Sequence, residues 1–441
     1  MTLLSMQVAS GNVFKDGETV CFLGDSITHV GLFHRFIYDY YLTRFPDRTI
    51  RFVNAGIAGD SAWGVQGRLT EDVTANKPTS VAIMFGMNDV NRGCYVSEPN
   101  AEQKAAQQAA LDSFQKNMVT LTGRLRREAG EPHLLFLTAS PFDQTGVNDA
   151  NNNQPGCNDG LSRCAEMVRI LAATNKGSVV DFNGPMTAFN LERQKAAPAY
   201  TIVGPDRVHP GTAGHLMMAC LFLKAQGAPA LVSKVVLDAA TGRVAESSNA
   251  TVSQVMNKTG TWEFTVLEKA LPFPMDESAK AELALLPIEQ ELNQETLSIT
   301  GLATDKYELL IDGASAGRYS ADELSKGVNL AFNSATPQYK QAKSVAKMNG
   351  TRHSTEVILR NYAAVRWFLN NCQINPDDFA AVEVFAETKM NKAGYFEGMV
   401  PDYLINWPKR GDLTAKIKVL EQQLSAARHP VSHAYVLRPA R

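Results

Sequence analysis

The sequence is poor in the features that mark several classes of protein. Its 441 residues include only six cysteines, too few for a disulfide framework at this length, and no pair has the spacing of a zinc site. No apolar run approaches the ~20 residues that a membrane-spanning helix needs. The 43 basic and 45 acidic residues leave a net charge of −2, so no basic surface for nucleic acid is expected.

The beginning of the chain leaves its location open between two interpretations. Residues 3–10 are too short for a signal peptide and lack a basic start, yet Val8 and Ser10 suit the small-residue cleavage rule. The segment is therefore either the remnant of a signal peptide, which favours a secreted or periplasmic location, or a disordered terminus, which is compatible with a cytoplasmic one. Cys157 and Cys164 are close enough in sequence to bridge a loop, and whether they do stays open.

What the sequence does contain is an alternation of strands and helices. Hydrophobic residues make up 44% of the chain, enough for a sizeable core, and its length favours two or three domains. Strand-like segments near residues 19–23, 49–53, 80–85, 134–139 and 178–182 are separated by helical patterns, the clearest over residues 100–129. This order predicts a parallel five-stranded sheet with helices on both faces, a flavodoxin-like three-layer α/β/α domain.

The character of the sequence changes beyond residue 225. Polar and apolar residues alternate between 226 and 335, which predicts a β-rich accessory segment, and apolar stripes at helical spacing follow from 336 to 441. No linker separates these parts, so we expect both to pack on the domain formed by residues 12–225. Residues 313–317 fit the G-x-S-x-G pattern, but Asp312 and Gly313 read as a hairpin turn, so Ser315 is rejected as a nucleophile.

The stretch GDSIT at residues 24–28 stands between a strand pattern and a helix pattern. A serine in such a turn lies at the carboxyl edge of a parallel strand, where open α/β sheets bind ligands. Free backbone N–H groups at the start of the helix would also favour developing negative charge. Ser26 is therefore the candidate nucleophile, although a turn or a helix cap would account equally well for this stretch taken alone.

Three further motifs follow strand patterns or precede a helix pattern: NAGIAG at residues 54–59, GMND at 86–89 and DRVHP at 206–210. Together with GDSIT, in this order and spacing, they make residues 12–225 strongly resemble the SGNH (GDSL-type) hydrolase family. The first motif has Ile27 where leucine is commoner, a difference that leaves the chemistry intact. The four defining residues of the family fall on Ser26, Gly59, Asn88 and His209.

The resemblance implies a role for each of these residues. Ser26 would be the nucleophile, His209 its base, and Asp206 the carboxylate that orients the imidazole. The backbone N–H groups of Ser26 and Gly59 and the side-chain amide of Asn88 would form the oxyanion hole. The family requires no metal and no cofactor.

Two neighbouring residues receive more modest interpretations. Asp89 is expected to serve turn chemistry only. His215 is predicted to be a core or helix-surface histidine rather than the partner of His209 in a metal site.

Loops at the same edge of the sheet should shape the substrate site. Trp63 lies in one of them, and Arg92 and Tyr95 lie in the next, which makes these three the candidate substrate-binding residues. A third loop, over residues 141–156, is rich in asparagine and aspartate, including Asn148, Asp149 and Asn151–Asn153. Such a polar rim suits a polar substrate, and it is equally typical of a solvated loop.

These observations favour a serine esterase that cleaves short-chain esters, above all O-acetyl groups on carbohydrate, through an acyl-enzyme. A small-molecule or glycan ester is the expected substrate. The alternatives are a lipase or lysophospholipase-like acylhydrolase, acyl transfer between sugars, and a non-catalytic carbohydrate-binding protein on the same fold. The intact Ser26, Asn88, Asp206 and His209 argue against the last of these.

Overall fold

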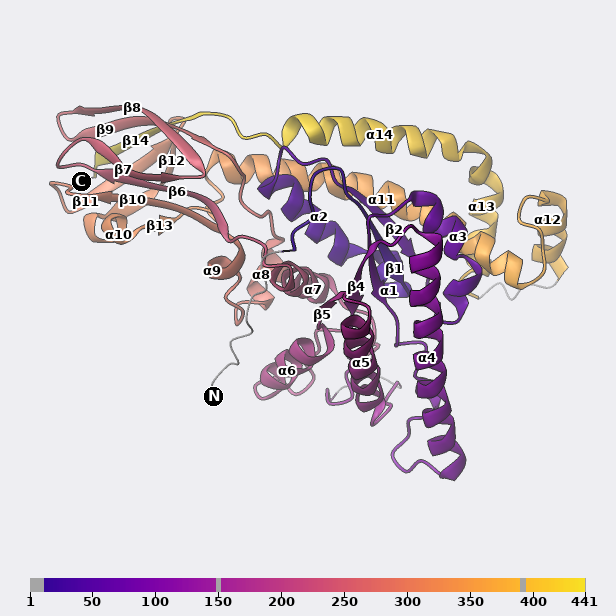
Figure 1. Ribbon diagram of the computed structural model, residues 1–441. Helices are drawn as coiled ribbons and strands as arrows, with labels where there is room; N and C mark the ends of the chain where they lie inside the picture. The colour runs from indigo at the N-terminus through magenta and orange to yellow at the C-terminus, as the bar shows by residue number, and fades with distance from the viewer. Residues whose placement is uncertain (1–11, 148–151, 389–393, 441) are drawn as a thin grey trace.

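The computed structural model describes residues 12–147, 152–388 and 394–440 of the chain (Figure 1). The expectation of a signal-peptide remnant at residues 3–10 lies outside these ranges, as does the polar-rim expectation for Asn148, Asp149 and Asn151. None of the helices in the described ranges is long and apolar enough to cross a membrane.

The first half of the chain forms a parallel sheet of five strands. They are β1 (Thr19–Gly24), β2 (Arg51–Gly56), β3 (Ser80–Met84), β4 (His133–Leu137) and β5 (Ser178–Val180). Their order in the sheet is β2-β1-β3-β4-β5, which is the flavodoxin-like arrangement. The predicted fold class is therefore confirmed.

Helices cover both faces of this sheet because its strands are apolar on both sides. Within β1, Val20 and Phe22 face α2 (Leu32–Arg44) and α7 (Thr212–Ala225), while Cys21 and Leu23 face α4 (Ala101–Glu128) and α5 (Cys157–Thr174). The predicted helix over residues 100–129 is confirmed as α4. Cys157 and Cys164 both lie on α5 as free thiols, so they do not bridge a loop.

The second part of the chain is a sandwich of two sheets with the orders β13-β10-β6-β7 and β12-β11-β14-β9-β8. One apolar core lies between them, to which both sheets contribute. The hairpin predicted at Asp312 and Gly313 is confirmed between β11 and β12, which places Ser315 on a strand. The strands are β6 (Leu231–Asp238), β7 (Arg243–Ser248), β8 (Ala250–Lys258), β9 (Thr261–Glu268), β10 (Gln294–Thr300), β11 (Lys306–Ile311), β12 (Ala314–Ser320), β13 (Val328–Asn329) and β14 (His433–Pro439).

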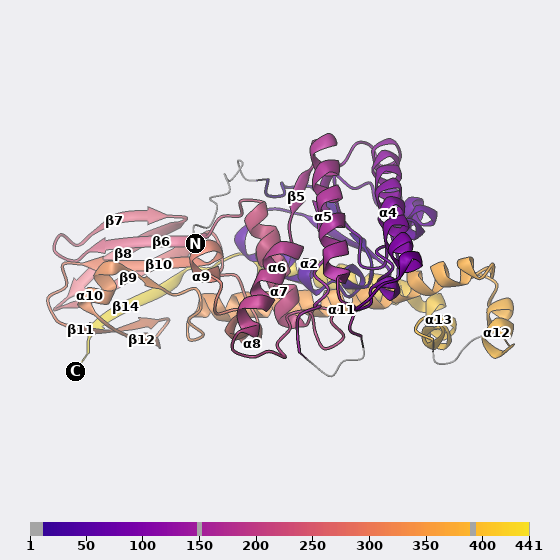
Figure 2. The ribbon, with the colours of Figure 1, turned by 90° about the horizontal axis from the view of Figure 1, so that it is seen from below.

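One long helix joins the parts of the molecule. Figures 1 and 2 show α11 (Pro337–Asn371) running from the sandwich along the α/β domain to α12 (Phe379–Thr388) and α13 (Val400–Asn406). From there α14 (Arg410–Ala427) returns beside α11 towards the sandwich (Figure 1). The shorter helices are α1 (Ser26–Val30), α3 (Leu69–Asp72), α6 (Asn183–Gln194), α8 (Glu277–Glu282), α9 (Ile288–Leu292) and α10 (Ala321–Lys326).

The segment 336–441 differs from the helical prediction at one place. Residues His433–Pro439 form β14, which pairs antiparallel with β9 on one side and with β11 on the other. The physical reason is a short alternation in which His433, Tyr435 and Leu437 are buried while Ala434 and Arg438 are exposed. The chain therefore returns to the sandwich after its helices.

His215 lies on α7 inside the core, where its ring stacks parallel to that of Phe33 at a centroid distance of 6.2 Å. Burial lowers the pKa of His215 to about 3, and its Nδ1 has no hydrogen-bond partner among the described residues. The folded protein thus keeps this imidazole neutral, whereas the unfolded chain protonates it below pH ~6.5. The stability that His215 contributes is present above pH ~6.5 and is lost as the pH falls towards 3.

We therefore expect His215→Phe to flatten the acid side of the stability profile. Between pH 7 and pH 5 the free energy of unfolding should fall by about 2 kcal/mol less in the variant than in the wild type. Urea unfolding followed by circular dichroism at both pH values measures this difference. An equal fall in the two proteins would contradict the burial of a neutral imidazole.

Candidate active site

Three polar side chains, one from the beginning and two from the end of the α/β domain's sequence, meet at the carboxyl edge of the sheet. The Ser26 Oγ lies 2.8 Å from His209 Nε2, although the two residues are 183 positions apart in sequence. The Nδ1 of His209 lies 2.5 Å from the Asp206 Oδ2. Hydroxyl, imidazole and carboxylate thus form one hydrogen-bonded line, in which the imidazole can take the hydroxyl proton.

The turn between β1 and α1 presents Ser26 as the first residue of the helix. Asp25 caps this helix by accepting a hydrogen bond from the Ile27 N–H at 3.1 Å. Burial raises the pKa of the Asp25 carboxyl to about 7. The end of β2 touches the same helix, since a Cβ on Gly56 would lie 2.2 Å from the His29 backbone nitrogen. Glycine at 56 therefore permits the close approach of the end of β2 to α1.

The loop that carries His209 is fixed by its own carboxylate and by an arginine. The Asp206 Oδ1 accepts the backbone N–H groups of Val208 at 3.0 Å and His209 at 2.9 Å. Arg207 adopts a left-handed conformation with a φ of 67°, and its buried Nη1 donates to the carbonyls of Asp143 and Gly146. The loop is thereby anchored to the start of the 141–156 stretch.

Asp206 is held in its charged form. Partial burial alone would raise the pKa of this carboxyl, but hydrogen bonds from the His209 backbone, the His209 ring and the Val208 backbone lower it below its usual value. The carboxylate therefore keeps the imidazole proton on Nδ1, which leaves Nε2 free to accept the proton of Ser26.

The residues expected to form the oxyanion hole with Ser26 lie on the loops that follow β2 and β3. Gly59 is exposed with a φ of 75°, and a Cβ there would meet nothing within 4 Å. Its N–H and that of Ser26 make no hydrogen bond with any described residue. The Asn88 Nδ2 donates to the Asp60 carbonyl at 2.9 Å, which holds the amide beside the Gly59 loop and leaves its second hydrogen available.

Asp89 does more than the turn chemistry expected of it. One oxygen of its carboxylate accepts the Ala62 N–H at 2.9 Å, and the other accepts the Gly86 N–H at 3.0 Å. The side chain therefore ties the loop after β3 to the loop after β2. Burial raises the pKa of Asp89 to about 7.

The three expected substrate-binding residues have different surroundings. Trp63 is 73% exposed on the loop beyond Gly59, and Arg92 is half-buried. Tyr95 is not exposed at the rim of the site: it is buried against α5, where its ring fills the space beside Gly160. It lines a hollow of about 420 Å³ together with Pro155, Asp159 and Arg163, among others. Contact of these three residues with substrate stays a prediction.

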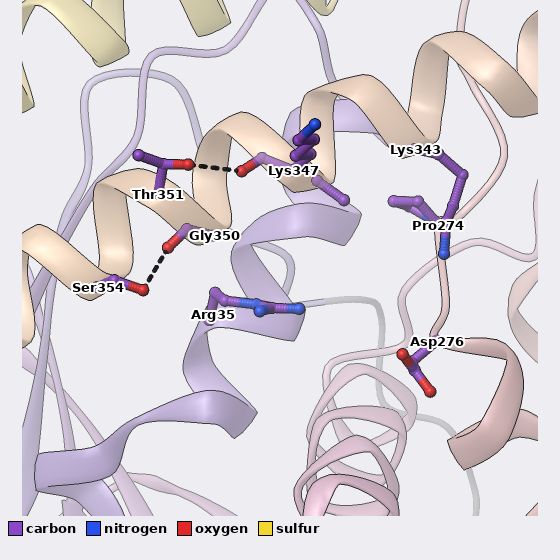
Figure 3. A pocket seen from close by; sticks show the side chains of 9 residues that line it. Arg35, Pro274, Asp276, Lys343, Lys347, Gly350, Thr351 and Ser354 are labelled. Atoms are coloured by element: carbon purple, nitrogen blue, oxygen red, sulfur yellow. Dashed lines mark hydrogen bonds between the residues drawn. The ribbon is translucent and has the colours of Figure 1, made fainter.

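A separate groove of about 400 Å³ lies between α2, α11 and the loop before α8 (Figure 3). Figure 3 shows the Arg35 guanidinium extending from α2 beneath α11. The Lys343 ammonium donates to the Met275 carbonyl, and the Ser354 hydroxyl donates to its own helix. None of the predicted site residues lines this groove.

Acidic, histidine and cysteine side chains do not gather in groups of three or more that could hold a metal ion anywhere in residues 12–147, 152–388 or 394–440.

The loop geometry predicts that only one of the two glycines that flank His209 is sensitive to substitution by alanine. Gly204 has a φ of 76°, and a Cβ there would lie 2.6 Å from the His209 carbonyl oxygen, whereas a Cβ on Gly211 would meet nothing within 4 Å. Gly204→Ala should displace the imidazole and slow fluorophosphonate labelling of Ser26 at least roughly 10-fold. Gly211→Ala, the matched control, should label at nearly the wild-type rate. Equal rates for both variants, read by mass spectrometry, would contradict this account.

Comparison with known proteins agrees with the geometry. Residues 22–217 match the GDSL-like Lipase/Acylhydrolase family. The solved structure of a gut microbial diltiazem-metabolizing enzyme is 32% identical, with a TM-score of 0.90, over 97% of this chain and 99% of that one. An acetylxylan esterase from Geobacillus stearothermophilus is 29% identical over 226 residues, which are 48% of this chain and 94% of that protein. The chain therefore belongs to the GDSL-like lipase/acylhydrolase family and is a carboxylic ester hydrolase.

Proposed function

We propose that this esterase removes short acyl groups, principally acetyl groups on carbohydrate, through an acyl-enzyme formed on Ser26. The observation that carries the proposal is the hydrogen-bonded line from Ser26 through His209 to Asp206. This line supplies a nucleophile, a base and an orienting carboxylate, which are the three groups that acyl transfer to a serine requires.

In the first half of the reaction the Ser26 Oγ attacks the ester carbonyl while His209 Nε2 takes the hydroxyl proton. The resulting oxyanion accepts hydrogen bonds from the N–H groups of Ser26 and Gly59 and from the Asn88 amide. His209 then returns the proton to the leaving alkoxide, and an acyl-serine remains. A water molecule, activated by His209 in turn, attacks the acyl-serine and releases the acid.

The openness of the site supports a short acyl group on a bulky polar alcohol. The side chains of His209 and Asp206 are 50% and 47% exposed, so a large leaving group can reach the serine from solvent. Asn152, in the polar 141–156 loop, donates its side-chain amide to the Asp206 carbonyl at 2.7 Å. The exposed indole of Trp63 offers a flat apolar face to a sugar ring. The acetylxylan esterase relative is consistent with such a substrate.

Ser26→Ala should lower kcat by roughly 10⁴- to 10⁶-fold with the fold unchanged, because it removes the nucleophile. Ser315→Ala, in the other serine motif, is the matched control and should keep full activity. The assay uses 4-nitrophenyl acetate, butyrate and octanoate, and kcat/KM should fall as the chain lengthens. Acid release by Ser26→Ala at the wild-type rate would end the serine mechanism, and a preference for octanoate would favour a lipase.

Trp63→Ala should raise KM for acetylated xylo-oligosaccharides by roughly 3- to 10-fold, which is the loss expected for one aromatic contact. KM for 4-nitrophenyl acetate should stay the same, and Trp63→Phe should restore most of the affinity. Released acetate is measured for each substrate, with diltiazem as the non-carbohydrate comparison. Faster turnover of diltiazem than of the acetylated oligosaccharides would contradict the carbohydrate assignment.

A further inference from the structure

We propose that Arg360, on α11 and outside the residues that match the family, is a positioning residue for ester hydrolysis that holds the Gly59 loop in register with Ser26. The inference rests on the proposed function, because the group it positions is an oxyanion donor. It assigns the segment beyond residue 336 a part in the reaction.

The contacts of Arg360 are with the two ends of the segment that carries Gly59, namely Gly56 at the end of β2 and Asp72 of α3. Its Nε donates to the Gly56 carbonyl at 2.6 Å, three residues before Gly59. Its two Nη atoms bind the two carboxylate oxygens of Asp72 at 2.8 and 2.6 Å. The arginine is 7% exposed, so these bonds form away from water. A planar guanidinium can satisfy a carbonyl and a bidentate carboxylate together, which a lysine cannot do.

A second arginine continues the network towards the site. Arg68 donates to Asp72 at 2.7 Å and to the Ala55 carbonyl at 2.8 Å, and its Nε donates to the Asp60 carboxylate at 2.7 Å. Asp60 is the residue directly after Gly59, and its carbonyl accepts the Asn88 amide. One continuous set of hydrogen bonds therefore runs from α11 to the loop that carries Gly59 and to Asn88.

The charges in this network balance only when Arg360 is present. Two guanidinium groups face two carboxylates in the interior, with Asp60 and Arg68 almost fully buried and Asp72 near them. Burial alone would raise the pKa of Asp72, but Arg360 and Arg68 lower it to about 2. With a neutral residue at 360, the Asp72 carboxylate keeps only Arg68 as a charged partner, and the Gly56 carbonyl loses its hydrogen bond from α11. The two defects lie on either side of the Gly59 loop, one at Gly56 before it and one at Asp72 of α3 after it.

The helix itself is docked by other contacts, so Arg360 is not needed to hold it in place. Asn349 donates to the buried Asp39 carboxylate at 2.8 Å, and the His353 ring bonds the Val30 carbonyl at 2.9 Å. Val345 packs with Leu42 of α2. Removing the Arg360 head group should therefore disturb the loop beneath it while α11 stays where it is.

The test compares Arg360→Met and Arg360→Lys with Arg366→Met. Arg366 lies on the same helix, but it pairs with Asp377 and stacks on Trp407, away from the Gly59 loop. The number of active serines in each protein is titrated to its end point with a fluorophosphonate. Two quantities are then measured: kcat and KM for 4-nitrophenyl acetate per titrated serine, and the rate constant of fluorophosphonate labelling.

We expect Arg360→Met to lower kcat per titrated serine at least roughly 10-fold with little change in KM, because oxyanion stabilisation acts in the transition state. The labelling rate should fall in parallel. Arg360→Lys should have values between those of the wild type and Arg360→Met, and Arg366→Met should match the wild type. If Arg360→Met does not fold, Arg360→Lys carries the test alone.

Two results would overturn the inference. One is that the Arg360 variants keep the wild-type kcat and labelling rate per titrated serine and show only a lower Tm or fewer titrated sites. Arg360 would then stabilise the fold in general and would not position the Gly59 loop. The other is an equal loss in Arg366→Met. Failure of the wild type to cleave any ester would instead overturn the proposed function, while the labelling rates would still report on Arg360.

Discussion

The in-register pairing of parallel strands is the constraint on which the site depends. Gly24 at the end of β1 lies opposite Gly56 at the end of β2 and opposite Met84 at the end of β3. Parallel strands in register end at one edge, so the segments that follow them leave from neighbouring points. Ser26, Gly59 and Asn88 each lie two to four residues beyond such an end. A shift of one residue in either pairing would turn these loops away from each other.

The histidine reaches this edge by a different route, because it follows no strand. Its loop is held from three sides: Asp206 accepts two of its backbone N–H groups, Arg207 donates to two carbonyls of the 143–146 segment, and Asn152 donates to the Asp206 carbonyl. A base that must lie within hydrogen-bond reach of a serine needs such restraint, since small displacements are costly to catalysis. The His209 side chain is half exposed, whereas the Arg207 side chain that anchors the loop is buried.

The sequence predicted the α/β half of the molecule well, because both of its signals are local. Strands such as β1 and β3 are continuous apolar runs, and each of the four motifs is one short contiguous stretch of sequence. Distant partners could not be predicted in this way. Arg360 lies 288 residues from Asp72, and nothing in its surrounding helix pattern distinguishes it from a surface arginine. Arg68 and Arg207 were missed for the same reason, since their roles depend on backbone carbonyls that only the fold brings near.

The placement of β14 bears on how the molecule assembles during synthesis. Hairpins β8–β9 and β11–β12 are complete long before β14, which lies between them and pairs with both. The sheet that contains them therefore stays divided until α11 and α14 have been made and have brought β14 back. Such a long closure is slow, because its loop entropy is lost before its contacts form. In the interval each hairpin exposes an unpaired strand edge, on β9 and on β11, where it could pair with another chain.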